Sequence, residues 1–221
     1  MDGWRKTEFR VFHRIHNNLD TASASFSFNL LYPFSVLQET EEILSSLETA
    51  SSFDSREMSV TLHTTSGDIK IEIFCEAVPR TAENFLALCA SGSYDGTLFH
   101  RNIRGFMIQG GDPSGTGKGG QSIWGRPFAD EIRQTLRFNT RGVVAMANGG
   151  PDTNKSQFFI TYAKQPSLDG KYSIFGKVID GLDTTLDTME RVPVNPKNRP
   201  LTEIKLLNVT IHANPIADQA K

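Results

Sequence analysis

From residue 59 onward, apolar and polar residues alternate with the period of two that is typical of β-strands. The segment SVTLHT (59–64) is followed by the turn TSGD and then by DIKIEIF (68–74). In the second segment Ile69, Ile71 and Ile73 fall on one face. The pattern predicts a β-hairpin at the start of a folded domain.

Two later segments change to the period of a helix. In VPRTAENFLALCAS (78–91), Pro79 and Thr81 mark the start, and an apolar stripe runs along one side. In DGLDTTLDTMERV (180–192), Leu182, Leu186 and Met189 share a face. Both segments are predicted to be amphipathic helices.

Short apolar runs separated by Gly, Pro, Asn and Asp clusters predict further strands. These runs are FMIQ (106–109), GVVAMAN (142–148), SQFFITY (156–162), YSIFGKVI (172–179) and EIKLLNVTIHA (203–213). Because many strands accompany only two helices, the pattern predicts a mostly β fold. The expected architecture is a closed antiparallel barrel with helices over its ends.

The first part of residues 1–57 has no sustained hydrophobic period. We expect residues 1–57 to be an N-terminal extension, residues 58–214 to be the domain and residues 215–221 to be a tail. The stretch 35–50 has a capping box formed by Ser35 and Gln38, followed by leucines on one face. Three interpretations stay open: a short docked helix, a disordered tail, or an upstream extension of a protein that truly starts at Met58.

Composition excludes several classes of function. The net charge of −2 gives no global attraction to nucleic acid or to an anionic membrane, and no stretch has the roughly 20 apolar residues of a membrane helix. Cys75 and Cys89 are too few for a disulfide scaffold and are expected to be reduced, as in cytosol or nucleus. The five histidines lack ligand spacing, so we expect no metal.

The glycine-rich stretch GGDPSGTGKGG (110–120) resembles a phosphate-binding loop only superficially. Asp112 stands where a P-loop needs its first glycine, and Lys118 is followed by Gly119 rather than Ser or Thr. We expect a solvated loop between strands. The sequence also lacks a nucleophile motif, so an enzyme here would work without covalent catalysis, metal or cofactor.

Two segments point to a known family. FHRNIRGFMIQGGD (99–112) and MANGGPDTNKSQFF (146–159) resemble the signature segments of the cyclophilins, and the resemblance runs colinearly from Met58 to about Asn214. SIWG at Ser122 and LDGKYSIFGKV at Leu168 belong to it. The resemblance implies an eight-stranded barrel capped by two helices and peptidyl-prolyl cis–trans isomerase activity.

The resemblance also assigns roles to residues of this chain. Arg101 corresponds to the catalytic arginine, and Tyr172 stands where the best-known cyclophilins carry a histidine. The pocket for the substrate proline comprises Phe106, Met107, Phe159 and Leu168, and the residues that hold the neighbouring peptide backbone are Gln109, Ala147, Asn148 and Gln157. Ser167 replaces a rim tryptophan that supports cyclosporin binding, which implies weak inhibition by that drug.

These residue types suit the reaction. Amide resonance sets a rotational barrier of roughly 18–20 kcal/mol, and no bond to carbon breaks when it is crossed. At the twisted transition state the imide nitrogen gains a free lone pair, which a guanidinium donor stabilises more than either planar isomer. An apolar pocket grips the ring while hydrogen bonds hold one side of the bond.

Within the family, GTGKGGQSIWG (115–125) and RPLTEIKLLNVTIHANP (199–215) are most similar to single-domain cyclophilins of the spliceosome. This implies a nuclear or cytoplasmic monomer that acts on proline-containing segments, in protein folding and with spliceosomal proteins, without direct contact to nucleic acid or membrane. The alternative is a proline-binding module or scaffold in a spliceosomal complex with little catalysis.

Overall fold

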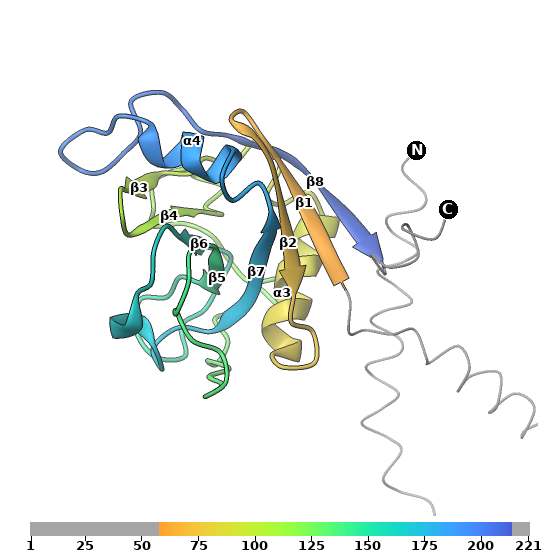
Figure 1. The fold of residues 1–221 in the computed structure, drawn as a ribbon. Helices are drawn as coiled ribbons and strands as arrows, with labels where there is room; N and C mark the ends of the chain where they lie inside the picture. Colours follow the sequence, from red (N-terminus) through yellow and green to blue (C-terminus); the bar gives the residue numbers. More distant parts are fainter. Residues whose placement is uncertain (1–57, 214–221) are drawn as a thin grey trace, which may run out of the picture. The chain divides into compact units, whose positions relative to one another are not determined.

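The computed structural model describes residues 58–213, which belong to a unit spanning Arg56–Lys221. Within residues 58–213, eight strands form one antiparallel sheet in the order β3-β4-β6-β5-β7-β2-β1-β8 (Figure 1). The strands are β1 (Met58–Thr64), β2 (Gly67–Ile73), β3 (Arg101–Ile103), β4 (Met107–Gly110), β5 (Val143–Met146), β6 (Phe158–Thr161), β7 (Ile174–Asp180) and β8 (Leu206–Ala213). Residues 1–57, for which three interpretations were left open, lie outside the described residues.

The predicted hairpin is confirmed. Strands β1 and β2 pair from Met58↔Ile73 to Thr64↔Gly67. The isoleucines at 69, 71 and 73 are fully buried, so the alternation in the sequence does separate a core face from an outer one.

The prediction of a closed barrel is wrong, because the sheet curls into an open half-barrel (Figure 1). Strand β8 pairs with β1 and β3 pairs with β4, but no ladder joins β3 to β8. The segment before β3 meets the segment at the start of β8 through an isolated bridge between Leu98 and Lys205. Backbone hydrogen bonds from Phe99 N to Ile204 O (2.9 Å), from Gly96 N to Leu206 O (2.7 Å) and from Leu206 N to Thr97 O (2.9 Å) add to this contact. Turns at Gly92 and Gly96, with φ angles of 70° and 76°, precede the bridge at Leu98.

Two α-helices accompany the sheet within residues 58–213: α3 (Pro79–Ala90), which contacts β8, and α4 (Thr185–Arg191), which contacts β2 and β3. The α3 N-terminus has no local side-chain cap. Instead Glu131, 50 residues away in sequence, accepts hydrogen bonds from the backbone N–H and hydroxyl of Thr81, at 2.7 and 2.6 Å. No helix in this part of the chain is long and apolar enough to span a membrane.

The alternation of side chains divides the apolar interior into two clusters. Even-numbered residues of β4, β5 and β6, such as Ile108, Val144 and Phe158, point into the main core with α3. Odd-numbered residues of the same strands, such as Met107 and Phe159, form a second, smaller cluster. Because successive side chains of a strand point to opposite faces, the second cluster lies on the other face of the sheet from the main core.

Candidate functional site

One row of cross-strand partners brings together residues that are far apart in sequence. Arg101 on β3 pairs with Gln109 on β4, Gln109 pairs with Phe159 on β6, and Phe159 pairs with Ala145 on β5. Directly paired residues project from the same face of a sheet. Arg101 and Gln109 therefore stand on the face that carries the second apolar cluster, and the Arg101 side chain is exposed there.

The predicted proline pocket is part of that cluster. Met107 and Phe159 are 3% and 4% exposed, while the half-buried residues Phe106, Leu168 and Tyr172 pack against them. The Tyr172 ring meets Phe159 edge-on, with ring centroids 5.4 Å apart and an interplanar angle of 87°. A buried floor with a partly exposed rim is the arrangement that an apolar ring needs in order to enter from solvent.

Phe138 is a member of the cluster that sequence reasoning missed. It is fully buried and stacks on Phe159 at a centroid distance of 5.8 Å with 13° between the planes. Asp169 Oδ1 accepts a hydrogen bond from the Phe138 backbone N–H at 2.8 Å, which ties this segment to the loop that carries Leu168. Phe138 lies in an irregular stretch without periodic pattern, so no local signal marked it.

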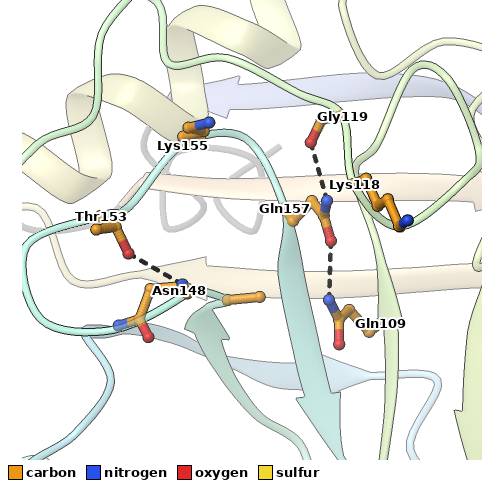
Figure 2. Close-up of a pocket in the computed structure, with 10 residues that line it drawn as sticks. Gln109, Lys118, Gly119, Asn148, Thr153, Lys155 and Gln157 are labelled. Atoms are coloured by element: carbon orange, nitrogen blue, oxygen red, sulfur yellow. Dashed lines mark hydrogen bonds between the residues drawn. The ribbon is translucent and has the colours of Figure 1, made fainter.

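A chain of amide hydrogen bonds borders the cluster (Figure 2). Gln109 Nε2 donates to Gln157 Oε1 at 2.8 Å, and Gln157 Nε2 donates to the carbonyl of Gly119 at 2.9 Å. The backbone N–H of Ala147 donates to Gln157 O at 2.9 Å. These bonds fix both glutamine side chains at the boundary between the apolar cluster and a neighbouring polar pocket.

The polar pocket is a cavity of about 290 Å³. It is lined by Gln109, Gly117, Lys118, Gly119, Ala147, Asn148, Gly149, Thr153, Lys155 and Gln157. Ala147 lines this pocket and also packs against the apolar cluster, so the two sites adjoin. All ten residues singled out in the sequence therefore lie on the shared sheet face, in the apolar cluster or around the polar pocket.

The side-chain amide of Asn148, which is half-buried, lies near two acceptors. Its Nδ2 lies 3.3 Å from Asp130 Oδ1 and 3.3 Å from the carbonyl of Lys171. Asp130 also accepts a 2.7 Å hydrogen bond from Asn154 Nδ2 and a 2.9 Å one from the backbone N–H of Asp152. Asp130 thus holds the segment around Asn148 in place, and the role of Asn148 toward a peptide stays a prediction.

The glycine-rich loop contributes to the site, which the sequence did not predict. The buried carboxylate of Asp112 accepts hydrogen bonds from the backbone N–H groups of Ser114, Gly117 and Gly119, at 2.9, 2.7 and 3.1 Å. Gly117 has a φ of +84° and lies against the ring of His100, so both its conformation and its surroundings favour glycine. The fold of the loop places Lys118 at the pocket.

Burial shifts the pKa values of His100 and Cys75. Burial lowers the pKa of His100, next to Arg101, so the imidazole is neutral at physiological pH. Burial raises the pKa of Cys75 to about 11, and neither Cys75 nor Cys89 is in a disulfide in this part of the chain. Among residues 58–213 there is no group of three or more ligating side chains that could hold a metal ion.

The fold and this constellation match one family. The profile of the cyclophilin type peptidyl-prolyl cis-trans isomerase/CLD family covers residues 59–211, and the chain belongs to that family.

Two named relatives match this chain over 99% of their own lengths. The peptidyl-prolyl cis-trans isomerase-like 3 of Rhizopus delemar is 71% identical over 73% of this chain and 99% of its own. The protein of the same name from Homo sapiens is 66% identical over 72% of this chain and 99% of its own.

A solved structure agrees with the fold. The crystal structure of a Cryptosporidium parvum cyclophilin type isomerase is 52% identical, with a TM-score of 0.70, and covers 72% of this chain and 99% of that one. A second structure described for the same Cryptosporidium protein was determined in the presence of the dipeptide Ala-Pro, with a TM-score of 0.69.

Proposed function

We propose that this protein accelerates rotation about X–Pro bonds, with Arg101 as the catalytic donor and the second apolar cluster as the proline pocket. The observation that carries the proposal is the row Arg101–Gln109–Phe159, which sets an exposed guanidinium and an amide beside an apolar floor on one sheet face. The Ala-Pro dipeptide used with the Cryptosporidium relative supports a ligand of this class.

The mechanism requires no covalent intermediate. The proline ring is held between Phe106, Met107 and Phe159, with Leu168 and Tyr172 at the rim. Gln109, fixed by Gln157, presents its remaining polar groups to the peptide backbone, so one side of the bond is held while the other turns. Arg101 donates to the imide nitrogen only when rotation has freed its lone pair, which lowers the barrier rather than deepening the ground state.

Arginine suits this role because its guanidinium stays charged and presents donors in a rigid fork. An acceleration of roughly 10⁵-fold requires about 7 kcal/mol of transition-state stabilisation, at about 1.4 kcal/mol per tenfold. One charged donor supplies part of this, and alignment of the held peptide supplies the rest.

The test is exchange NMR on a short Ala-Pro peptide with the full chain at substoichiometric concentration. Free X–Pro bonds exchange over roughly tens to hundreds of seconds, so catalysed exchange within the NMR mixing time is unambiguous. Binding of the peptide without acceleration would favour the alternative, a proline-binding module or scaffold.

We further propose that the protein assists folding and acts in the nucleus or cytoplasm with spliceosomal proteins, as the segments at 115–125 and 199–215 imply by their resemblance. Affinity purification of the tagged full chain from nuclear and cytoplasmic extracts tests this. Recovery of spliceosomal proteins from the nuclear extract supports the proposal, and their absence from both extracts contradicts it.

Cyclosporin is expected to inhibit this protein weakly. Ser167, which stands where the rim tryptophan is implied, is exposed in the short 3₁₀-helix η2 (Pro166–Leu168) at the edge of the apolar cluster. A serine there offers little apolar area to the drug, while an indole buries 150–250 Å². We expect Ser167→Trp to lower the inhibition constant by at least about tenfold, because 1.4 kcal/mol corresponds to a factor of ten. Tight inhibition of the wild type that does not change in the variant would contradict this.

A further inference from the structure

Two lysines line the polar pocket beside the proline site. Among its lining residues, Lys118 and Lys155 are the charged ones, and no carboxylate lines it. Lys118 is exposed and Lys155 is half-buried, and Figure 2 shows them on either side of Gln157. Among the described residues, Gln109 Nε2 and Gln157 Nε2 each donate one hydrogen bond, which leaves each amide a second N–H for an anion.

The carboxylates of Asp112, Asp130 and Asp152, which adjoin the pocket residues, accept hydrogen bonds from N–H groups and form no ion pair with Lys118 or Lys155 within residues 58–213. Asp112 is buried under its own loop, and Asp130 accepts from Asn154 Nδ2 and the backbone N–H of Asp152. Asp152 Oδ1 in turn accepts from the Asp130 backbone N–H at 2.8 Å. The ion pairs found within residues 58–213 include neither Lys118 nor Lys155. Both ammonium groups are therefore available to an incoming anion.

The dimensions fit one side chain of the peptide. A cavity of about 290 Å³ lies just below the usual range for small-molecule sites, about 300–1,000 Å³, so it suits a side chain better than a cofactor. In an extended peptide, side chains two residues apart lie on the same side and about 6.6 Å apart. Since Ala147 belongs to both sites, a peptide with its proline in the apolar cluster can place the side chain two positions away in the polar pocket.

We propose that this pocket makes the enzyme select substrates with an anionic side chain, a carboxylate or a phosphate, two positions from the proline. The inference rests on the proposed function, because it specifies which X–Pro segments the same site prefers. Lys118 and Lys155 are the specificity-determining residues, and the second side-chain N–H groups of Gln109 and Gln157 orient the bound anion.

The experiment measures kcat/KM by exchange NMR for matched peptides that carry Glu, Gln or phosphoserine two positions before or after the proline. For the wild type we expect Glu to exceed Gln by about fivefold at one of the two positions, since exposed charge pairs contribute modestly, mostly through KM. The ratio should fall toward one at high salt, because salt screens exposed charges. Comparison of the Glu and phosphoserine peptides identifies which anion is preferred.

The double variant Lys118→Gln/Lys155→Gln is expected to bring the Glu-to-Gln ratio close to one. Lys197→Gln is the matched control, since Lys197 is exposed in the loop before β8 and does not line the pocket; it should keep the wild-type ratio. The inference is overturned if the wild type has a Glu-to-Gln ratio of kcat/KM of one, or if the wild-type ratio persists in the double variant. In either case, continued catalysis of the Gln peptide leaves the proposed function intact. Absence of catalysis with every peptide overturns the proposed function itself.

Discussion

Arg101→Ala is expected to lower kcat/KM for an Ala-Pro peptide by about 10²- to 10³-fold, the usual effect of removing one preorganised transition-state donor. The loss should fall mostly on kcat, because the planar isomers do not offer the lone pair to which Arg101 donates. Binding of the peptide depends on the apolar cluster and should change little. Exchange NMR at several peptide concentrations separates the two constants.

The melting temperature of Arg101→Ala shows whether Arg101 acts as a catalytic hydrogen-bond donor or stabilises the fold. Arg101 is exposed on the short strand β3, so its removal should leave the melting temperature within a few degrees of the wild type. Arg104→Ala is the matched control, since Arg104 is also exposed three residues further on. Arg101→Lys keeps the charge but loses the fork of donors and should recover only part of the rate. Full activity in Arg101→Ala would contradict the mechanism.

The parts of the fold that follow from local pattern were predictable from the sequence. Strands β1 and β2 alternate strictly, and α3 has both a proline near its start and an apolar stripe, so each was assigned correctly. Helix α4 begins later than predicted, at Thr185, because the turn at Gly181 has a φ of +89° and precedes it. The three-residue strand β3 was missed, since three residues do not establish a period.

The closure of the sheet was not predictable in the same way. Whether β3 and β8 form a ladder depends on the path of residues 92–100, which passes through two glycine turns and meets residues 204–206 by an isolated bridge and a few backbone hydrogen bonds. For the site, the resemblance supplied ten residues, and the structure gathers them around two adjoining sites. Phe138 and the glycine-rich loop were missed because they reach the site through tertiary contacts, a ring stack and the hydrogen bonds to Asp112, that leave no mark on local spacing.

Asp112→Asn tests whether the hydrogen bonds to Asp112 hold the glycine-rich loop. The substitution is expected to lower the free energy of unfolding by about 3 kcal/mol at pH 7, because several N–H groups lose a buried charged acceptor. Burial raises the pKa of the Asp112 carboxyl, but hydrogen bonds from Ser114, Gly119 and Gly117 together outweigh it and hold the pKa below its ordinary value. Folding is therefore favoured by the ionised form. The stabilisation by ionised Asp112 is present above about pH 4, the pKa of an aspartate in the unfolded chain. It is lost as the pH falls through the lower pKa that Asp112 has in the folded protein.

Urea unfolding at pH 7, 5, 4 and 3 measures this contribution as the difference between the wild type and Asp112→Asn. We expect the difference to be constant from pH 7 to 5 and to shrink below pH 4. Asp183→Asn, an exposed aspartate at the turn before α4, should change the stability by less than about 0.5 kcal/mol at every pH. A difference between wild type and Asp112→Asn that is the same at pH 3 as at pH 7 would show that the charge of Asp112 does not hold the loop. The loop carries Lys118 and the Gly119 carbonyl that fixes Gln157, so the variant should also lose preference for the anionic peptide.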